Sequence, residues 1–169
     1  MSERDPIKAW VRDARAQRRV GPGAVCTSCR LERRAFALIA GHSPPLCFAC
    51  DRIAYGRAPV EDNHLFGKHN SDAAATVPVN DHRAVLSVAQ YEWPPRTLEN
   101  PEGSSLREAA ARLRGRGDMV KYMLEDSRAS AEALEHLDGL LTKVYGPRWL
   151  PKLEAAARRL SRRRARRVK

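Results

Sequence analysis

The sequence predicts an α+β protein that is mostly helical and carries a small metal-binding module. Two C-x2-C pairs, separated by 17 residues, lie within residues 26–50. Residues 60–66 and 75–79 are expected to be short strands, and apolar residues recur at helical spacing through residues 105–145. Together these features favour a small mixed core that is followed by a helical C-terminal region.

Length and composition limit the class of protein. The chain has 169 residues, which is enough for one ordinary domain or for a small domain with appendages. It is 43% hydrophobic and 6% aromatic, so we expect a core of mostly Ala, Leu and Val. No apolar run approaches the roughly 18 residues that a membrane span needs, and the N-terminus MSERDPIKAW lacks an apolar signal region. We therefore expect a soluble, cytoplasmic protein that does not enter a membrane, in the host cell if a phage encodes it.

The first twenty residues are expected to form an N-terminal helix. Residues 3–19 have helical character, with Ser2 or Asp5 as the N-cap and Pro6 in the first turn, where proline is tolerated. Arginines fill the exposed faces of this helix.

The four cysteines predict a structural zinc site. Two residues between a pair of thiolates allow both sulfurs to face one metal, and the connection between the pairs lets the chain return for the second pair. Four thiolates close a tetrahedral zinc site and leave no open position, so the metal is expected to be structural rather than catalytic. Two disulfides or four buried thiols are the alternatives. The expected ligands are Cys26, Cys29, Cys47 and Cys50.

The segments beside the cysteines are short. Residues 31–40 fit either a hairpin strand or a helical turn, and residues 48–57 fit a short helix that Gly56 ends. Gly67–Ala75 is expected to be the loop between the two strands. Residues 80–91 are expected to be a helix capped by Asn80 or Asp81 and stopped by Trp93-Pro94-Pro95.

A helical hairpin is predicted for residues 104–150. Ser105 and Glu108 form a capping box, and Gly115 or Gly117 is the expected break between the two helices. Apolar residues at helical spacing are expected to form the core of this hairpin. They are Met119, Tyr122, Met123, Leu134, Leu137, Leu140, Leu141 and Val144.

The C-terminus is strongly basic. The net charge is +11, and residues 158–169 contribute eight of the cations with no acid, which leaves +3 for the rest of the chain. Such a block attracts polyanions because each phosphate contact releases counterions, so we expect it to bind nucleic acid. A solvated tail is the alternative, and the missing apolar face argues against a membrane surface. The expected nucleic-acid contacts are Arg158, Arg159, Arg162, Arg163, Arg164, Arg166, Arg167 and Lys169.

Residues 60–100, about a quarter of the chain, resemble the HNH endonucleases, whose active site is the ββα-metal fold. The resemblance lies in His64, the Gly67-Lys-His-Asn70 turn, Val77-Pro78-Val79 and His82-Arg83. Many members carry C-x-x-C zinc knuckles beside the active site, as the four cysteines do here. The implied organisation is an N-terminal helix (1–20), a zinc-stabilised HNH core (21–103), a helical hairpin (104–150) and a basic tail (151–169).

The resemblance implies a role for each of these side chains. His64 would be the general base that takes a proton from water, which a neutral imidazole does well near neutral pH. His82 would bind one divalent cation, Mg²⁺ or Mn²⁺. Asn70 would orient His64 or stiffen the loop, and Arg83 would pair with a neighbouring phosphate.

The first ligand of the catalytic ion departs from the family outline. Family members usually have Asp or His immediately before the catalytic histidine, whereas this chain has Asn63. Asp62 or Glu61 is the alternative ligand. Strand alternation places Asp62 on the face that His64 uses and Asn63 on the other face.

Two further positions remain open. Asn80 lies close to the final histidine and competes with Asn70 for the asparagine of the motif, and His69 is a further candidate ligand. The C-x-x-C often found around the final histidine is absent, so zinc must be held upstream.

The resulting expectation is a metal-dependent endonuclease of HNH type that hydrolyses phosphodiester bonds in DNA rather than RNA. The alternative is a zinc-stabilised nucleic-acid-binding protein without catalysis. Few aromatic residues are placed to stack on bases, so strong sequence readout is not expected. A phage enzyme, a mobile element or a host defence protein would each fit this sequence, and the oligomeric state is not predicted.

Overall fold

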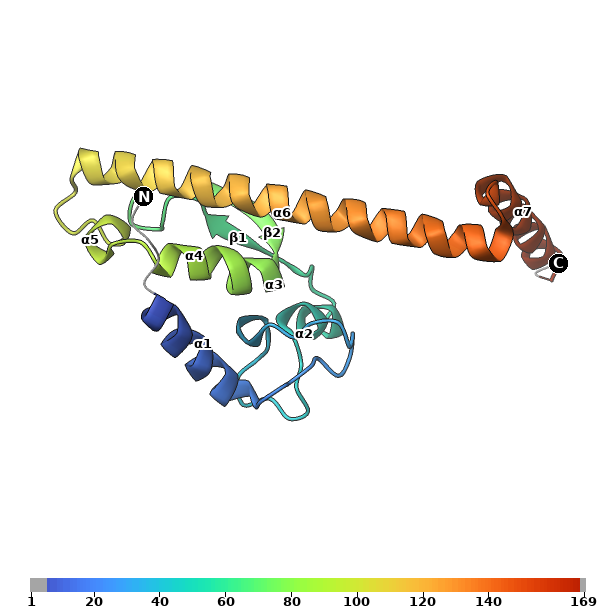
Figure 1. The fold of residues 1–169 in the computed structure, drawn as a ribbon, viewed down its shortest axis with the longest axis horizontal. Coiled ribbons are helices and arrows are strands. Elements are labelled where there is room, and N and C mark those ends of the chain that lie inside the picture. Colours follow the sequence, from blue (N-terminus) through green and yellow to red (C-terminus); the bar gives the residue numbers. More distant parts are fainter. Residues whose placement is uncertain (1–5, 168–169) are drawn as a thin grey trace. The chain divides into compact units, whose positions relative to one another are not determined.

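The computed structural model describes residues 6–167, with side chains up to Arg159 (Figure 1). The fold is mostly helical with one two-stranded sheet, as predicted. The chain divides into two compact units between Tyr122 and Met123. No helix of the described residues combines the length and the apolar character that a membrane crossing requires.

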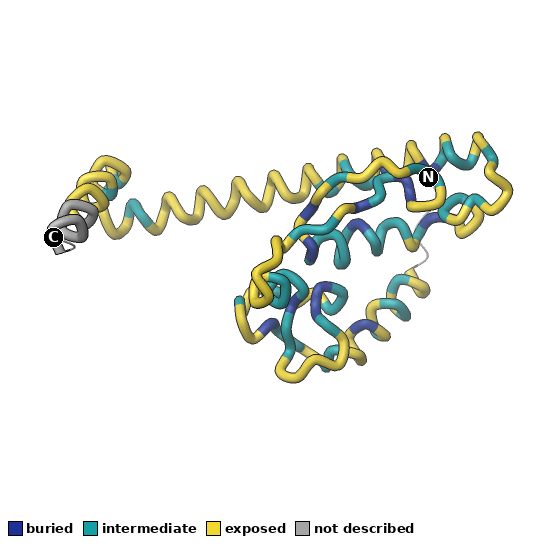
Figure 2. Tube along the Cα trace, turned by 180° about the vertical axis from the view of Figure 1, so that it is seen from behind, coloured by how far each residue is buried: buried dark blue, intermediate teal, exposed yellow. Residues whose placement is uncertain are grey.

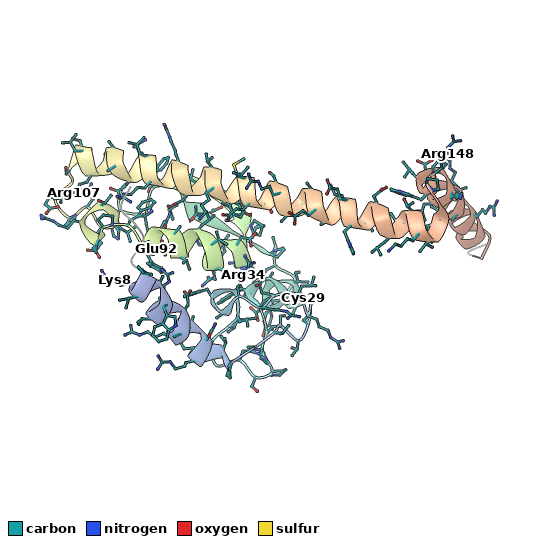
Figure 3. All side chains as sticks on the ribbon, in the orientation of Figure 1. Lys8, Cys29, Arg34, Glu92, Arg107 and Arg148 are labelled. Atoms are coloured by element: carbon teal, nitrogen blue, oxygen red, sulfur yellow. The ribbon has the colours of Figure 1, made fainter. Side chains whose placement is uncertain are left out.

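The N-terminal helix α1 (Pro6–Val20) agrees with the prediction for residues 3–19, and its expected caps, Ser2 and Asp5, lie outside the described residues. Pro6 is its first residue. Ala16 is its buried residue. Arg12 forms an ion pair at 3.1 Å with Glu92, which is labelled in Figure 3, and this pair ties α1 to the segment after α4 (Ser87–Tyr91).

The segment that follows α1 folds around the cysteines. It contains a short 3-10 turn, η1 (Ala35–Ala37), and the helix α2 (Phe48–Ala54). Of the ambiguous residues 31–40, only Ala35–Ala37 form a helical turn, and Leu38 forms an isolated antiparallel bridge with Cys47. Cys26, Leu38 and Cys47 are the buried centre of this module.

The predicted strands form an antiparallel hairpin, β1 (Val60–His64) and β2 (Ala74–Pro78). Glu61 lies opposite Val77, and His64 lies opposite Ala74. The connecting loop begins with a turn at Gly67, whose φ of +79° belongs to the left-handed region that glycine adopts freely. This turn positions Asn70, which lies three residues later.

The predicted helix at residues 80–91 is built from three consecutive pieces. They are α3 (Val79–Asp81), a π-helical turn η2 (His82–Leu86), and α4. A π-helical turn is wider than an α-helical turn and is found frequently at functional sites. Val79 and Leu86 are buried, and α5 (Pro95–Leu98) follows the Trp93-Pro94-Pro95 stop.

The next helix, α6 (Ser105–Tyr145), is buried only in its first part. Ala111 is fully buried, and Asp118 Oδ2 accepts a hydrogen bond from Trp93 Nε1 at 2.8 Å. Gly115 is buried against the backbone of Leu65, where a Cβ atom would lie 1.8 Å from the carbonyl oxygen. The first turns of α6 therefore pack directly on the end of β1 (Figure 1).

Two predictions about the C-terminal region are wrong. Gly115 and Gly117 do not break the helix, because Gly115 is needed for close packing and the helical hydrogen bonds continue through both. The apolar residues expected in a hairpin core are largely exposed: Met123 is 58% and Leu134 is 67% accessible. The chain turns only at Gly146, after which α7 (Trp149–Arg167) takes in most of the predicted basic tail.

The contact between α6 and β1 gives a direct test. We expect Gly115→Ala to lower the free energy of unfolding by about 1–3 kcal/mol or more, because the added methyl group overlaps the Leu65 carbonyl. Gly117→Ala is the matched control, since nothing lies within 4 Å of its Cβ position. It should stabilise the helix by about 0.5–1 kcal/mol. Chemical denaturation of both variants measures the difference, and equal effects would contradict this packing.

Candidate functional site

The four predicted cysteines meet in one place. All are free thiols, and their sulfur atoms lie within 4.8 Å of one another. Thiolates that bind one tetrahedral zinc at ~2.3 Å lie about 3.8 Å apart, so small movements would bring the sulfurs to coordination distance. The cysteines are thus positioned to hold a metal ion, and a set of four sulfur donors fits zinc.

Backbone N–H groups point at the sulfurs. Cys47 N donates to Cys26 Sγ, and Cys50 N donates to Cys47 Sγ, both at 3.4 Å. Burial raises the pKa of the Cys26 thiol, but hydrogen bonds from the backbone of Cys29, Cys47 and Ser28 outweigh this effect and lower the pKa to about 6. Burial and the neighbouring sulfurs raise the pKa of Cys50 to about 12. The backbone N–H groups therefore stabilise the thiolate form of Cys26, which is the form that binds a metal.

A chain of polar contacts joins the cysteine module to the segment that carries His82. Asn80 Oδ1 accepts a hydrogen bond from the Ala49 amide at 3.0 Å, and Asn80 Nδ2 donates to Glu32 Oε2 at 3.1 Å. Arg34 pairs with both Glu32 and Asp81, and the arginine is labelled in Figure 3. The side-chain amide of Asn80 therefore holds the cysteine module against α3.

A second set of polar contacts between the cysteine module and the His82 segment is centred on Glu61. The sequence alone makes Glu61 only an alternative ligand of the catalytic ion. Its Oε1 atom lies 2.6 Å from Arg52 and 2.8 Å from Arg83. Its Oε2 atom lies 2.9 Å from His82 Nδ1. Burial alone would raise the pKa of Glu61, but the hydrogen bonds from Arg83, His82 and Arg52 lower it to about 2. A single ionised carboxylate thus connects α2, β1 and η2.

The contact with Glu61 fixes which nitrogen of His82 carries the shared proton. An ionised carboxylate only accepts hydrogen bonds, so His82 Nδ1 must carry the proton that the pair shares. In the neutral ring, Nε2 then has the free lone pair. Histidines that bind metals commonly donate their other ring N–H to a carboxylate in this way. The contact between Nδ1 and Glu61 therefore leaves Nε2 of a neutral His82 available to bind a cation.

The hairpin sorts the other predicted ligands by face. Side chains alternate along a strand, so Asn63 lies on the same face as Glu61, whereas Asp62 and His64 lie on the opposite face. Asn63 is 2% accessible, and its Oδ1 atom has no hydrogen-bond partner. Asp62 is exposed and accepts a hydrogen bond from Thr76 Oγ1 at 2.8 Å. The structure brings Glu61, not Asp62, against His82.

His64 precedes the loop between the strands, and Asn70 lies within it. His64 lies at the end of β1, and its buried Nδ1 atom has no partner; its backbone carbonyl accepts from Gln90 Nε2 at 2.6 Å. Asn70 Nδ2 donates to the carbonyls of Thr97 and Leu98 at 2.9 and 3.2 Å, which ties the loop to α5. Asn70 Oδ1 is buried without a partner.

The unpartnered atoms are concentrated in this short segment. Of the four buried polar side-chain atoms that lack a partner among the described residues, three belong to Asn63, His64 and Asn70. Buried polar atoms are nearly always hydrogen-bonded, so each exception in a native protein suggests a functional role or an unseen water or ion. The fourth atom, Arg12 Nε, lies elsewhere in the fold, on α1.

The predicted nucleic-acid contacts are only partly described. Arg83 is not a free cation: its guanidinium pairs with Glu61 and lies 4.2 Å from the centre of the Phe48 ring. Arg158 pairs with Glu154 at 3.1 Å, and Arg159 is exposed. The remaining contacts have side chains outside the described residues, and they are Arg162, Arg163, Arg164, Arg166, Arg167 and Lys169.

A basic groove along α1 was not singled out from the sequence. Its volume is about 770 Å³, and it is lined by apolar and cationic side chains of one helix. The helical spacing of the arginines between residues 12 and 19 was the available signal. The lining residues are Ile7, Lys8, Val11, Arg12, Arg15, Arg18 and Arg19.

No family model, curated protein or solved structure matches this chain. Within the described part of the chain, the four cysteines form the one group of three or more His, Cys, Asp or Glu side chains close enough to share an ion. The Glu61–His82 pair and the unpartnered Asn63 amide lie outside that cluster.

The cysteine cluster predicts that metal is required for folding. We expect one zinc ion per chain by elemental analysis, and we expect Cys47→Ser to lose the metal and to lower the melting temperature sharply, since metal binding contributes to the free energy of folding. His42→Ala is the matched control, because this histidine lies between the cysteine pairs but outside the cluster. A Cys47→Ser variant that melts like the wild type would show that the site is not structural.

The Glu61 network predicts a specific loss of stability in acid. Because the pKa of Glu61 is about 2 in the folded state and near 4.5 when unperturbed, its ionisation stabilises the fold above pH 4.5 and stops doing so as the pH falls toward 2. We expect Glu61→Gln to lower the free energy of unfolding by about 2–3 kcal/mol at pH 7. This is less than the loss of a fully buried ion pair would cost, because Arg83 is partly exposed. The cost should shrink as the pH falls toward 2.

Urea denaturation of both proteins across this pH range measures the effect. The exposed residue Glu99 provides a control, Glu99→Gln. If the difference between wild type and Glu61→Gln is constant with pH, the carboxylate is not held as described.

Proposed function

We propose that this chain is a metal-dependent endonuclease of HNH type that hydrolyses phosphodiester bonds in DNA. The observation that carries the proposal is the concentration of unpartnered buried polar atoms on Asn63, His64 and Asn70, in and after the strand whose Glu61 fixes the tautomer of His82. These residue types suit phosphodiester hydrolysis, which needs a proton acceptor and a cation beside the phosphate.

The catalytic ion in this proposal is Mg²⁺ or Mn²⁺, held by His82 Nε2 and Asn63 Oδ1. The buried and unpartnered Asn63 oxygen supports this choice over Asp62, which lies on the other face of the strand. Glu61 orients His82 through Nδ1 and adds negative charge near the ion. When bound, such an ion neutralises charge on the scissile phosphate and on the leaving 3′ oxygen.

His64 is the general base in this proposal. Its imidazole takes one proton from water, and the resulting hydroxide attacks the phosphorus atom. The bond between phosphorus and the 3′ oxygen breaks, and that oxygen then takes up a proton from solvent. The products are a 3′ hydroxyl and a 5′ phosphate. Asn70 acts as a positioning residue, because its amide ties the loop that follows His64 to α5.

Zinc bound by the four cysteines has a structural role in this proposal. The cysteine module is linked to β1 by Arg52, through Glu61 to η2, and to α3 by Asn80. Fixing the module therefore fixes the hairpin and the helix that carry Glu61 and His82. The metal would support the site without contacting the substrate.

The basic surfaces supply affinity for the DNA backbone. The groove along α1 and the arginines of α7 are cationic, and phosphate contacts by such residues position a duplex without reading its sequence. Arg83 remains a candidate phosphate contact only if substrate displaces it from Glu61, since its guanidinium is already paired.

A zinc-stabilised binding protein without catalysis is the second candidate. The amide at position 63 favours it, because an amide oxygen binds a divalent cation more weakly than the carboxylate or imidazole found at this position in the HNH outline. Both candidates predict DNA binding that weakens with salt. They differ only in turnover.

A plasmid-cleavage assay separates the two candidates. We expect the wild type to nick or linearise DNA with Mg²⁺ or Mn²⁺ and to stop in EDTA. His64→Ala should lower the rate by roughly 10²–10⁴-fold, the usual contribution of a general base, while its DNA affinity is unchanged. His136→Ala, an exposed histidine on α6, should retain full activity.

Two results would contradict the proposal. A wild type that binds DNA but does not cut it with any divalent ion supports the binding protein. Cleavage that persists undiminished in His64→Ala rules out the assigned base. Zinc content is measured on the same samples, so that loss of activity in EDTA is not confused with loss of the cysteine-bound metal.

A further inference from the structure

The second unit has no core of its own. From Met123 to Arg159 no described side chain is buried, and Figure 2 shows this part of α6 as a nearly continuous exposed helix. Helices in proteins gain most of their stability from packing an apolar face, not from intrinsic propensity. A long helix with apolar side chains in water is therefore incomplete until something covers that face.

The exposed apolar side chains follow a seven-residue repeat. Leu134 and Leu141 occupy one repeating position (a), and Met123, Leu137 and Val144 occupy the position three residues later (d). Such a pattern forms the contact line of a coiled coil. Accessibility along this line, which we call the seam, is 58% at Met123, 67% at Leu134, 48% at Leu137 and 71% at Val144.

The residues beside the seam are compatible with an identical helix in parallel orientation. In a parallel pair, each residue before an a position faces the residue five places later in the partner. Leu140 would then face Tyr145 of the other copy, and both are exposed. Asp126 would face Ala131, and Ala133 would face Asp138, so neither acid meets another acid.

Charged residues occupy the opposite face of the helix. Arg128, Glu132, Glu135 and Lys143 lie outside the seam and its flanks in this repeat. Asp138, the one flanking acid near the C-terminal end, already accepts a hydrogen bond from Trp149 Nε1 at 2.7 Å. The charge pattern thus places no like-charge pair across a parallel interface.

We propose that residues 123–145 of α6 pair with the same residues of a second copy to form a parallel coiled-coil dimer. The occupant of the seam is a second copy, because each copy carries the same apolar repeat and a parallel pair brings no two like charges together beside it. Ser127 and Ser130 occupy the central a and d positions, so the pairing is strongest at the C-terminal end of the helix. This dimer does not depend on the proposed nuclease activity.

The mass of the full zinc-loaded chain in solution tests the proposal. Light scattering and sedimentation should give twice the 18.9 kDa of one chain, falling toward one chain on dilution. Leu134→Glu combined with Leu137→Glu should give a monomer with unchanged zinc content. Ala129→Glu combined with His136→Glu adds the same number of acids on the outer face and should remain dimeric.

Orientation is tested separately with Val144→Cys. A parallel pair brings the two copies of residue 144 together, so mild oxidation should link them by a disulfide, whereas an antiparallel pair holds them a helix length apart. A wild type that stays monomeric at every concentration would overturn the proposal and leave the seam to a different protein. A dimer that survives the Leu134 and Leu137 substitutions, or that never cross-links at 144, would overturn it as well.

Discussion

The carboxylate of Glu61 is the interaction on which the arrangement of the first unit depends. It accepts hydrogen bonds from Arg52 on α2 and from His82 and Arg83 on η2, while its own backbone belongs to β1. Three short elements, none of them long enough to be stable alone, are thereby held around one charge. Burying a charge is costly unless every lone pair is used, and here both oxygens are engaged.

The same carboxylate connects the fold to the proposed chemistry. By accepting the Nδ1 proton of His82, it leaves Nε2 as the ring nitrogen that can bind a cation. The cysteine module contributes at a distance, because Arg52 belongs to the helix that begins directly after Cys47. A change in the metal-binding module would therefore reach His82 through α2 and Glu61, without any direct contact between the cysteine-bound metal and a substrate.

Helix α6 illustrates the limit of periodicity as a structural signal. Apolar residues recur along its whole length, and this spacing predicts the core of a helical hairpin. Its first part does pack, through Ala111 and Gly115, but the residues after Met123 remain exposed. A repeat of apolar residues predicts that a face will be covered. It does not say whether the cover comes from the same chain or from another.

The sequence by itself determined the elements: the cysteine pairs, the two strands and the helix at residues 80–91, because local spacing and turn residues encode these directly. Only the tertiary structure decided the polar partners. Strand alternation could exclude Asp62 from the face of Asn63, but the choice of Glu61 for His82 required the distance between β1 and η2. Likewise, Asn80 and Asn70 looked equivalent in the sequence. In the folded protein the Asn80 side chain bonds Ala49 and Glu32, whereas Asn70 Oδ1 has no partner. Local sequence does not show this difference, because burial and hydrogen bonding depend on contacts between residues far apart in the chain.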